Sequence, residues 1–133
     1  MLTCYYLSII LQDSINLQLI QGLTLTDYNL NTILLDDKNY LGGSTIYQDN
    51  DEFKIDNKNS SDWLQKEISN LKNYKNLIIK NRTSLAAYHG YNYLLARENL
   101  TDHLNINEKK NKIRQRLWKI RAKKVIIASG SIE

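Results

Sequence analysis

Proline is absent from this 133-residue chain, and cysteine occurs once, as Cys4. A single cysteine excludes a disulfide framework and a cysteine-based zinc cage within the chain, and it fits a reducing compartment. No apolar run approaches the ~18 residues of a membrane-spanning helix. The apolar segment 4–11 lacks the basic flank and the small-residue cleavage site of a signal peptide. We therefore expect a cytoplasmic protein that does not associate with membranes. The missing proline, with abundant Asn, Lys and Ile, indicates a biased nucleotide composition rather than a structural demand.

Glycine is scarce in the first part of the chain, where Gly22 is the only glycine before Gly42. The segment 4–11 predicts a strand, and the spacing of the apolar residues after it predicts a helix over about residues 14–28. In nucleotide-binding α/β domains the turn between such a strand and helix is G-x-G-x-x-G, whose backbone N–H groups hold the phosphates. That motif is missing here, and Asp13 at this place would repel a pyrophosphate. The sequence therefore lacks the phosphate-binding turn of such a site.

The formal net charge is modest, at +4, and several of the basic residues lie close together in the sequence. The basic residues that fall close together are Lys109, Lys110, Lys112, Arg114 and Arg116. Few aromatic residues interleave them and no nucleic-acid-binding motif frames them, which favours a solvated loop or hairpin edge over a nucleic-acid site. Hydrophobic residues make up 42% and charged residues 24% of the chain. Together with the length, these values indicate one small globular domain.

The stretch 32–44, T-I-L-L-D-D-K-N-Y-L-G-G-S, is the most informative part of the sequence. Its first four residues predict a buried strand, and Asp36 and Asp37 follow where that strand ends. In open α/β sheets an acid at this place accepts hydrogen bonds from ribose hydroxyls, and Gly42 and Gly43 would let the backbone pass close to a ligand. A strand followed by an ordinary polar turn is the alternative reading. Adjacent strand residues point to opposite faces, so a proton shared between the two acids is not expected.

The rest of the chain predicts a mixed α/β fold. We expect a helix capped by Ser60 or Ser61 that ends near 72–74, with a buried stripe of Leu64, Ile68 and Leu71. The expected strands are 77–79, parallel to the strand at 32–35, then 83–88, 91–96, 116–121 and 124–128. The segments 83–88, 91–96 and 116–121 would form a small antiparallel layer. Polar stretches at 48–61 and 105–112 are expected to be exposed.

Two histidines and one tryptophan could indicate a binding site, but a structural role is the simpler interpretation of each. His89 and His103 lie fourteen residues apart with no carboxylate or cysteine at ligand spacing, so no metal site is expected. Trp118 alternates with Arg116 and Lys119 along a half-exposed strand. It is predicted to pack within the small sheet rather than to stack on a ligand.

Several segments together resemble a known family. In order and spacing, they resemble the dinucleotide-binding domain of the alpha subunit of heterotetrameric sarcosine oxidase, and related amine dehydrogenase large subunits share the pattern. The segments are 35–44, 62–64, 76–84, 101–104 and 114–133. The most specific part is R-L-W-K-I-R-A-K-K-V running into A-S-G-S-I-E. The resemblance implies an incomplete Rossmann-like dinucleotide-binding domain, with parallel strands and a small antiparallel β layer. It covers about residues 24–133, truncated at the C-terminus, and leaves 1–23 as a divergent N-terminal segment.

The family pattern also implies binding residues for NAD, with FAD as a second candidate. Asp36 matches the acid that holds the adenosine ribose, and Asp37 is the adjacent candidate. Further cofactor-binding positions implied by the resemblance are Leu41, Gly42 and Gly43 in a loop beside the cofactor, Ser84 and Leu85 at a strand end near adenine, and Ala128, Ser129 and Gly130 in a turn approaching the dinucleotide. No catalytic residue maps onto the chain.

The resemblance implies a function only for a larger assembly. The chain would be a partial subunit of a sarcosine oxidase-like oxidoreductase, which carries out oxidative demethylation of sarcosine or a related secondary amine. It would supply part of a dinucleotide site and bind the other subunits of the complex. Because the phosphate-binding turn is missing, the alternative is a non-catalytic remnant or interaction subunit that binds no cofactor.

Overall fold

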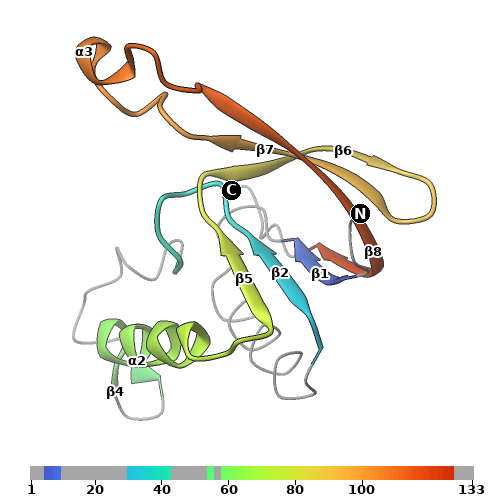
Figure 1. Ribbon diagram of the computed structural model, residues 1–133. Coiled ribbons are helices and arrows are strands. Elements are labelled where there is room, and N and C mark those ends of the chain that lie inside the picture. Colours follow the sequence, from blue (N-terminus) through green and yellow to red (C-terminus); the bar gives the residue numbers. More distant parts are fainter. Residues whose placement is uncertain (1–4, 10–29, 43–53, 56–57, 128–133) are drawn as a thin grey trace, which may run out of the picture.

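The computed structural model describes residues 5–9, 30–42, 54–55 and 58–127 (Figure 1). Its elements, in chain order, are β1 (Tyr5–Ile9), β2 (Thr32–Leu35), β3 (Lys54–Ile55), β4 (Lys58–Asn59), α2 (Ser60–Lys72), β5 (Leu77–Lys80), β6 (Thr83–His89), β7 (Tyr93–Asn99), α3 (Ile106–Lys109) and β8 (Gln115–Ile127). Six strands form one mixed sheet in the order β5-β2-β1-β8-β7-β6, and β3 pairs with β4 in a separate short hairpin. The expected mixed α/β class is therefore confirmed.

One half of the sheet is parallel. β2 lies between β1 and β5 and runs parallel to both, and β1 also pairs in parallel with the end of β8. Counted along the chain, the four parallel strands stand in the order third, second, first, fourth. This is the order of the first four strands in a doubly wound sheet. The strands predicted at 4–11, 32–35 and 77–79 are all present, and 77–79 is parallel to β2 as expected.

The last strand differs from the prediction. Separate strands at 116–121 and 124–128 were expected, but Gln115–Ile127 is one strand of 13 residues. Its first part pairs antiparallel with β7, and its last part pairs parallel with β1 across a register shift at Tyr5–Tyr6. The pairing partner changes along the strand while the strand itself continues. The antiparallel layer is therefore continuous with the parallel sheet rather than separate from it.

The antiparallel part is a β-meander of β6, β7 and the first part of β8. β6 and β7 were predicted as 83–88 and 91–96, joined around His89–Gly90. The connecting turn instead centres on Tyr91 and Asn92, whose φ angles are 58° and 53°. Two successive residues with positive φ match the right-handed twist of a hairpin, which explains the shifted start of β7.

Helix α2 packs on one face of the parallel strands. Leu34 of β2, Leu41, and Leu64 and Leu71 of α2 form a buried cluster, joined by Ile68. This confirms the predicted apolar stripe of the helix. Ser60 was expected near the cap, but it is already the first helical residue and is buried, and Asn59 stands at the N-cap without a side-chain capping bond.

The meander covers the other face of the parallel strands. Ile33 and Leu35 of β2 alternate with Leu34, so they point to the side opposite α2. There they join a second buried cluster with residues of β7 and β8, which are Leu94, Ala96, Ile120 and Ala122. Trp118 packs against this cluster, as predicted. The result is three layers, with α2, the parallel strands and the meander stacked in that order (Figure 1).

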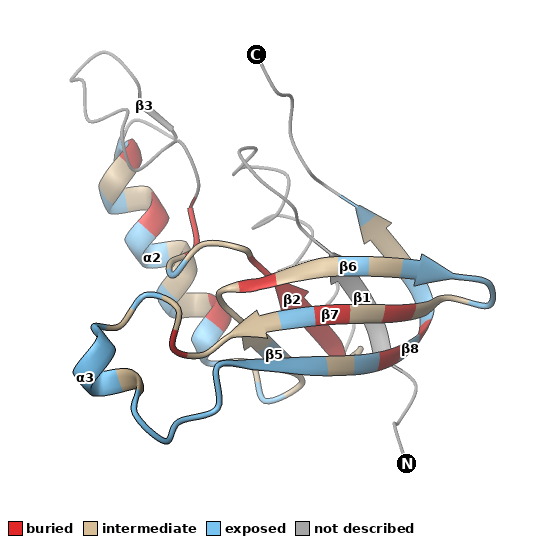
Figure 2. Cartoon of the chain, turned by 90° about the horizontal axis from the view of Figure 1, so that it is seen from above, coloured by how far each residue is buried: buried red, intermediate tan, exposed pale blue. Residues whose placement is uncertain are grey.

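The tip of the meander reaches beyond the core. The segment 100–114 carries the short helix α3, which Figure 2 shows as exposed. Asn105 and Glu108 form a capping box at its start, and Arg114 pairs with Asp102 at 2.6 Å. The hydrogen bond from Arg114 holds the pKa of the Asp102 carboxyl below its ordinary value. The basic run lies largely on this exposed extension, as expected for solvated charge.

Several expectations lie outside the described residues. They include the helix over 14–28, most of the polar excursion at 48–61, and the turn at 128–130. The division of the chain at residue 23 stays a prediction. The structure adds that residues 5–9 occupy the centre of the sheet, between β2 and β8. Among the described helices, none is long and apolar enough to cross a membrane.

Candidate functional site

The candidate site lies where β2 and β5 end, at the carboxyl edge of the parallel strands. Asp36 follows β2 directly, and its backbone N–H donates to the carbonyl of Lys80 at 3.0 Å. Its own carbonyl accepts from the backbone N–H of Thr83 at 2.8 Å. Asp36 is thereby fixed between the end of β5 and the start of β6, and only 6% of its surface is exposed.

Among the described residues, the Asp36 carboxylate has few partners for a buried charge. Its Oδ1 accepts one hydrogen bond there, from the backbone N–H of Lys38 at 2.7 Å. Burial raises the pKa of Asp36 to about 6, and the charge of Asp37 adds to this, while the Lys38 hydrogen bond acts in the opposite direction. At pH 7 the group is mostly ionised. It is thus a strong acceptor for hydroxyl donors brought by a ligand.

The loop after Asp36 is tied to the turn between β5 and β6. The backbone N–H of Arg82 donates to the carbonyl of Lys38 at 2.7 Å, and Asn81 Nδ2 donates to the carbonyl of Asn39 at 3.0 Å. Leu41 then packs into the cluster under α2, and buried Gly42 has a φ of 123°. A residue with a side chain would be strained at that φ. The tolerance of positive φ that the sequence analysis attributed to Gly42 therefore matches its conformation.

The structure brings some of the predicted positions together. Asp36, Asp37, Leu41 and Gly42 share this loop, and one carboxylate oxygen of Asp37 is buried without a hydrogen-bond partner. Gly43 and the turn of Ala128, Ser129 and Gly130 lie outside the described residues.

Ser84 and Leu85 stand near the start of β6, opposite Arg97 and Ala96 of β7. The Leu85 side chain packs against the core of the meander side. The Leu85 side chain is thus partly occupied by packing, and its backbone is the part to which the family pattern assigns a role near adenine. The roles of all these residues in binding stay predictions.

Two clefts adjoin this loop on the β5 side. The larger cleft has a volume of about 630 Å³ and is lined by residues 39–41, 79–82 and 98–100 together with Ile68 and Lys72 of α2. The smaller cleft, of about 330 Å³, is lined by residues 37–39 with Arg82, Asn99, Asp102 and His103. Asp36 lines neither. Arg82, Asn39 and Asn99 line both, so they form the wall between the two clefts.

Sequence reasoning missed Arg82, although it lies at the centre of this arrangement. Its φ is 52°, in the left-handed region, and its carbonyl accepts from the backbone N–H of Asn99 at 2.8 Å. In the sequence, the polar pair Asn81–Arg82 between two strand-forming runs predicts a turn. The same pattern does not predict which cleft that turn lines.

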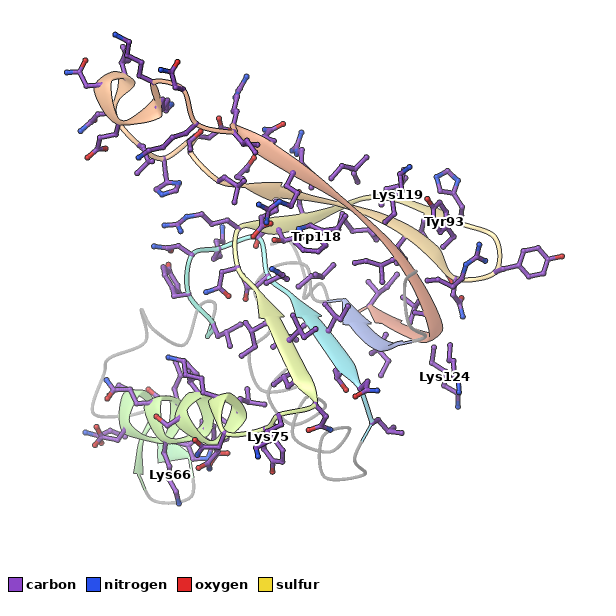
Figure 3. All side chains as sticks on the ribbon, viewed as in Figure 1. Lys66, Lys75, Tyr93, Trp118, Lys119 and Lys124 are labelled. Carbon is purple, nitrogen blue, oxygen red and sulfur yellow. The ribbon has the colours of Figure 1, made fainter. Side chains whose placement is uncertain are left out.

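A polar cluster closes the inner side of the meander beside this turn. Trp118 Nε1 donates to Glu98 Oε2 at 2.7 Å, and Arg116 Nη1 lies 3.5 Å from the same oxygen. Lys80 Nζ lies 4.3 Å from the centroid of the Trp118 ring, within cation–π range. Figure 3 shows Trp118 beneath β8, with Lys119 on the opposite side of the strand.

Replacing Arg82 tests how much the turn depends on its backbone geometry. Arg82→Val is expected to lower the free energy of unfolding by about 1–2 kcal/mol, because a β-branched residue is strained at positive φ. Arg82→Asn should change it by less than about 0.5 kcal/mol, because Asn tolerates this region. Urea unfolding of both variants provides the comparison. Equal losses would show that the guanidinium, and not the backbone, stabilises the turn.

Comparison with known proteins finds no matching family model, but a curated protein and solved structures do match. The sarcosine oxidase alpha subunit of Corynebacterium sp. strain P-1 is 29% identical to this chain over 101 residues. That region is 76% of this chain and 10% of the subunit. The resemblance to the sarcosine oxidase alpha subunit is confirmed. The chain thus spans about a tenth of the length of the curated relative.

The second match concerns the fold. The crystal structure of L-proline dehydrogenase from P. horikoshii superposes with a TM-score of 0.71 over 98% of this chain and 23% of that protein, at 22% sequence identity. At this identity the match shows a shared fold. It includes the parallel strands and the meander described above, because nearly the whole chain is covered.

Proposed function

We propose that this chain is part of an amine oxidoreductase and contributes a partial dinucleotide site within an incomplete Rossmann-like domain. The order of its four parallel strands supports this, because open α/β sheets bind ligands at the carboxyl ends of the strands. The observation that carries the proposal is Asp36, a buried carboxylate at the end of β2 with a single hydrogen-bond donor identified. NAD is the first candidate cofactor and FAD the second.

The residues fit the adenosine end of such a cofactor. Ionised Asp36 would accept the ribose hydroxyls, and Gly42 would bring the backbone close beside it. The backbone of Ser84 and Leu85 would border the adenine, and the turn 128–130 would approach the dinucleotide. The missing G-x-G-x-x-G leaves the pyrophosphate without its usual backbone donors. Bound dinucleotide would supply the redox chemistry, while this chain holds one end of it.

The reaction itself belongs to the whole enzyme. By the relationship to sarcosine oxidase, the substrate would be sarcosine or a related secondary amine, undergoing oxidative demethylation. The catalytic groups would lie outside this chain, and the other subunits of the complex would be its partners. We place this complex in the cytoplasm.

Calorimetric titration of the chain with NAD, and separately with FAD, tests the proposal. Asp36→Asn should weaken binding about tenfold or more, because a hydrogen bond to a charged acceptor contributes about 1.5–3 kcal/mol. Asp62→Asn removes the same charge from exposed α2 and should leave binding unchanged. Absence of binding to both dinucleotides would contradict a cofactor site in this chain. Unchanged binding by Asp36→Asn would contradict the role of Asp36.

A second candidate is an interaction subunit that binds no cofactor. It is favoured by apolar side chains left open on β8, where Leu117 is 54% and Ile127 52% exposed. Such residues suit contact with the remaining chains of an oxidase. Co-purification with a chain carrying the rest of the oxidase, lost in Ile127→Ser, would support this candidate. Dinucleotide binding by the chain alone would favour the first.

A further inference from the structure

We propose that the larger cleft, beside β5, binds a small organic anion. Its walls come from three directions, which are the loop after β2, the turn joining β5 to β6 with the end of β7, and the face of α2 carrying Ile68 and Lys72. Its volume of about 630 Å³ lies within the ~300–1,000 Å³ usual for small-molecule sites. Since Asp36 does not line it, the proposal does not rest on the dinucleotide site.

The charge of the cleft is unbalanced. Three cations line it, Lys72, Lys80 and Arg82, against the single acid Glu98. Glu98 is already engaged, because it accepts from the Trp118 indole and pairs with an Arg116 that does not line the cleft. In the described part of the chain, none of the three lining cations forms an ion pair. Asp37 and Asp102 line the smaller cleft, on the other side of the wall that Arg82 forms. Within the larger cleft, an entering anion would therefore meet an excess of positive charge.

Two of these cations have defined starting points before any ligand arrives. The backbone of Arg82 is fixed by hydrogen bonds to Lys38 on one side and Asn99 on the other, which sets where its side chain leaves the turn. The Lys80 ammonium lies over the Trp118 ring, which limits its freedom. Groups ordered in advance lose less conformational entropy when a ligand binds. The cleft is thus prepared for an anionic group near the β5–β6 turn.

The remaining walls indicate the rest of the ligand. Leu41, Ile68, Ile79 and Leu100 line the cleft beside the charged groups. Inorganic ions would leave this apolar surface in water, whereas a flat apolar body would cover it. The chemistry that fits is a carboxylate or phosphate group attached to a small apolar ring or chain. Arg82 is suited to either head group, because a guanidinium can bind both through two parallel hydrogen bonds.

The test uses benzoate, phenyl phosphate and inorganic phosphate as probes, titrated into the full chain by calorimetry. Benzoate or phenyl phosphate should saturate, and the tighter of the two identifies the head group. Inorganic phosphate should bind at least about tenfold more weakly than phenyl phosphate, because it cannot cover the apolar wall. No saturation by either organic probe up to 10 mM, about the weakest binding such a site would show, overturns the proposal, as does equal binding of the two phosphates.

Substitutions of residues that line the larger cleft test whether the probes bind there. Arg82→Asn, which keeps the backbone geometry, should weaken the better probe about tenfold, and Lys72→Gln, a change on an exposed helix position, should weaken it severalfold. Lys66→Gln is the matched control, because Figure 3 shows Lys66 on the side of α2 pointing away from β5. Wild-type affinity in both Arg82→Asn and Lys72→Gln would overturn the assignment to this cleft. Asp36→Asn should leave this binding unchanged, which separates it from the dinucleotide proposal.

Trp118 provides a local signal. The chain has two tryptophans, so Trp63→Phe leaves Trp118 as the only one. An anion that binds beside Lys80, whose ammonium lies over the Trp118 ring, should change the Trp118 emission with the same midpoint as the calorimetric titration. If calorimetry detects binding and the Trp118 emission does not change, the probe binds elsewhere on the chain and the proposal is contradicted.

Discussion

Asp36→Asn is expected to stabilise the folded chain at pH 7 by about 1–2 kcal/mol while weakening dinucleotide binding. The wild-type carboxylate is charged and buried, and burial is the largest cause of its raised pKa. An amide of the same shape carries no charge to desolvate. Its Oδ1 can still accept the hydrogen bond from the Lys38 N–H. Stability and binding therefore change in opposite directions, as expected where a residue is retained for function.

The raised pKa of Asp36 also predicts how the stability difference between the two proteins changes with pH. The pKa of Asp36 is about 6 in the folded chain and near the ordinary value of 3.8 when unfolded. Between about pH 4 and 6 the folded chain therefore binds more protons than the unfolded chain. The contribution of Asp36 makes the wild type lose stability as pH rises through this window. Asp36→Asn lacks this contribution, so the two proteins should be about equally stable near pH 4, diverge between pH 4 and 6, and differ by a constant amount above that window.

Urea unfolding of both proteins at pH 4, 5, 6 and 7 measures the effect. Asp62→Asn is the control, because Asp62 lies exposed in the first turn of α2 and benefits from the helix dipole. That variant should be destabilised slightly, by about 0.3–1 kcal/mol at pH 7. A loss of stability in Asp36→Asn at pH 7 would mean that the carboxylate has a strong partner which the described contacts do not include.

Leu94→Ala should have the largest effect on stability, a loss of about 3 kcal/mol. Leu94 of β7 has no exposed surface and lies where the meander packs against β2, in the cluster of Ile33, Leu35 and Ile120. Truncation removes buried methyl groups and leaves a cavity where two layers meet. For a domain of this size the loss would be a large share of the total free energy of unfolding.

Leu117→Ala is the matched control for this change. Leu117 lies on the neighbouring strand β8, opposite Arg97, and is 54% exposed. The same substitution there should cost less than about 0.5 kcal/mol, because little buried surface is lost. Thermal and urea unfolding of the two variants give the comparison. Similar losses in both would show that the outer face of the meander is also covered.

A loss of this size in Leu94→Ala would also carry a functional consequence. The meander holds Glu98 and Asn99 against the turn at Arg82, and that turn is bonded to the loop carrying Asp36. Loosening the contact between the layers should therefore weaken both the anion cleft and the dinucleotide site. The Asp36 and Arg82 variants should instead affect one site each. This contrast distinguishes a general loss of packing from loss of a specific contact.

The elements that the sequence alone determined are those with strong local patterns. The run Thr32–Leu35 followed by Asp36 predicted a buried strand and the acid at its end, and both are present. The spacing of Leu64, Ile68 and Leu71 predicted the buried stripe of α2, because the period of 3.6 residues places them on one face. Gly42 was recognised for its tolerance of positive φ, which the structure uses.

Only the tertiary structure decided how these pieces combine. The continuity of β8 depends on two different partner strands, β7 and β1, which no local pattern in 115–127 reveals. The larger cleft likewise joins Lys72, Arg82 and Glu98 from a helix, a turn and a strand that are distant in sequence. Local periodicity reports which face of an element is buried. It does not report which elements meet across a cleft, because that depends on strand order and on the folding of the meander over the parallel sheet.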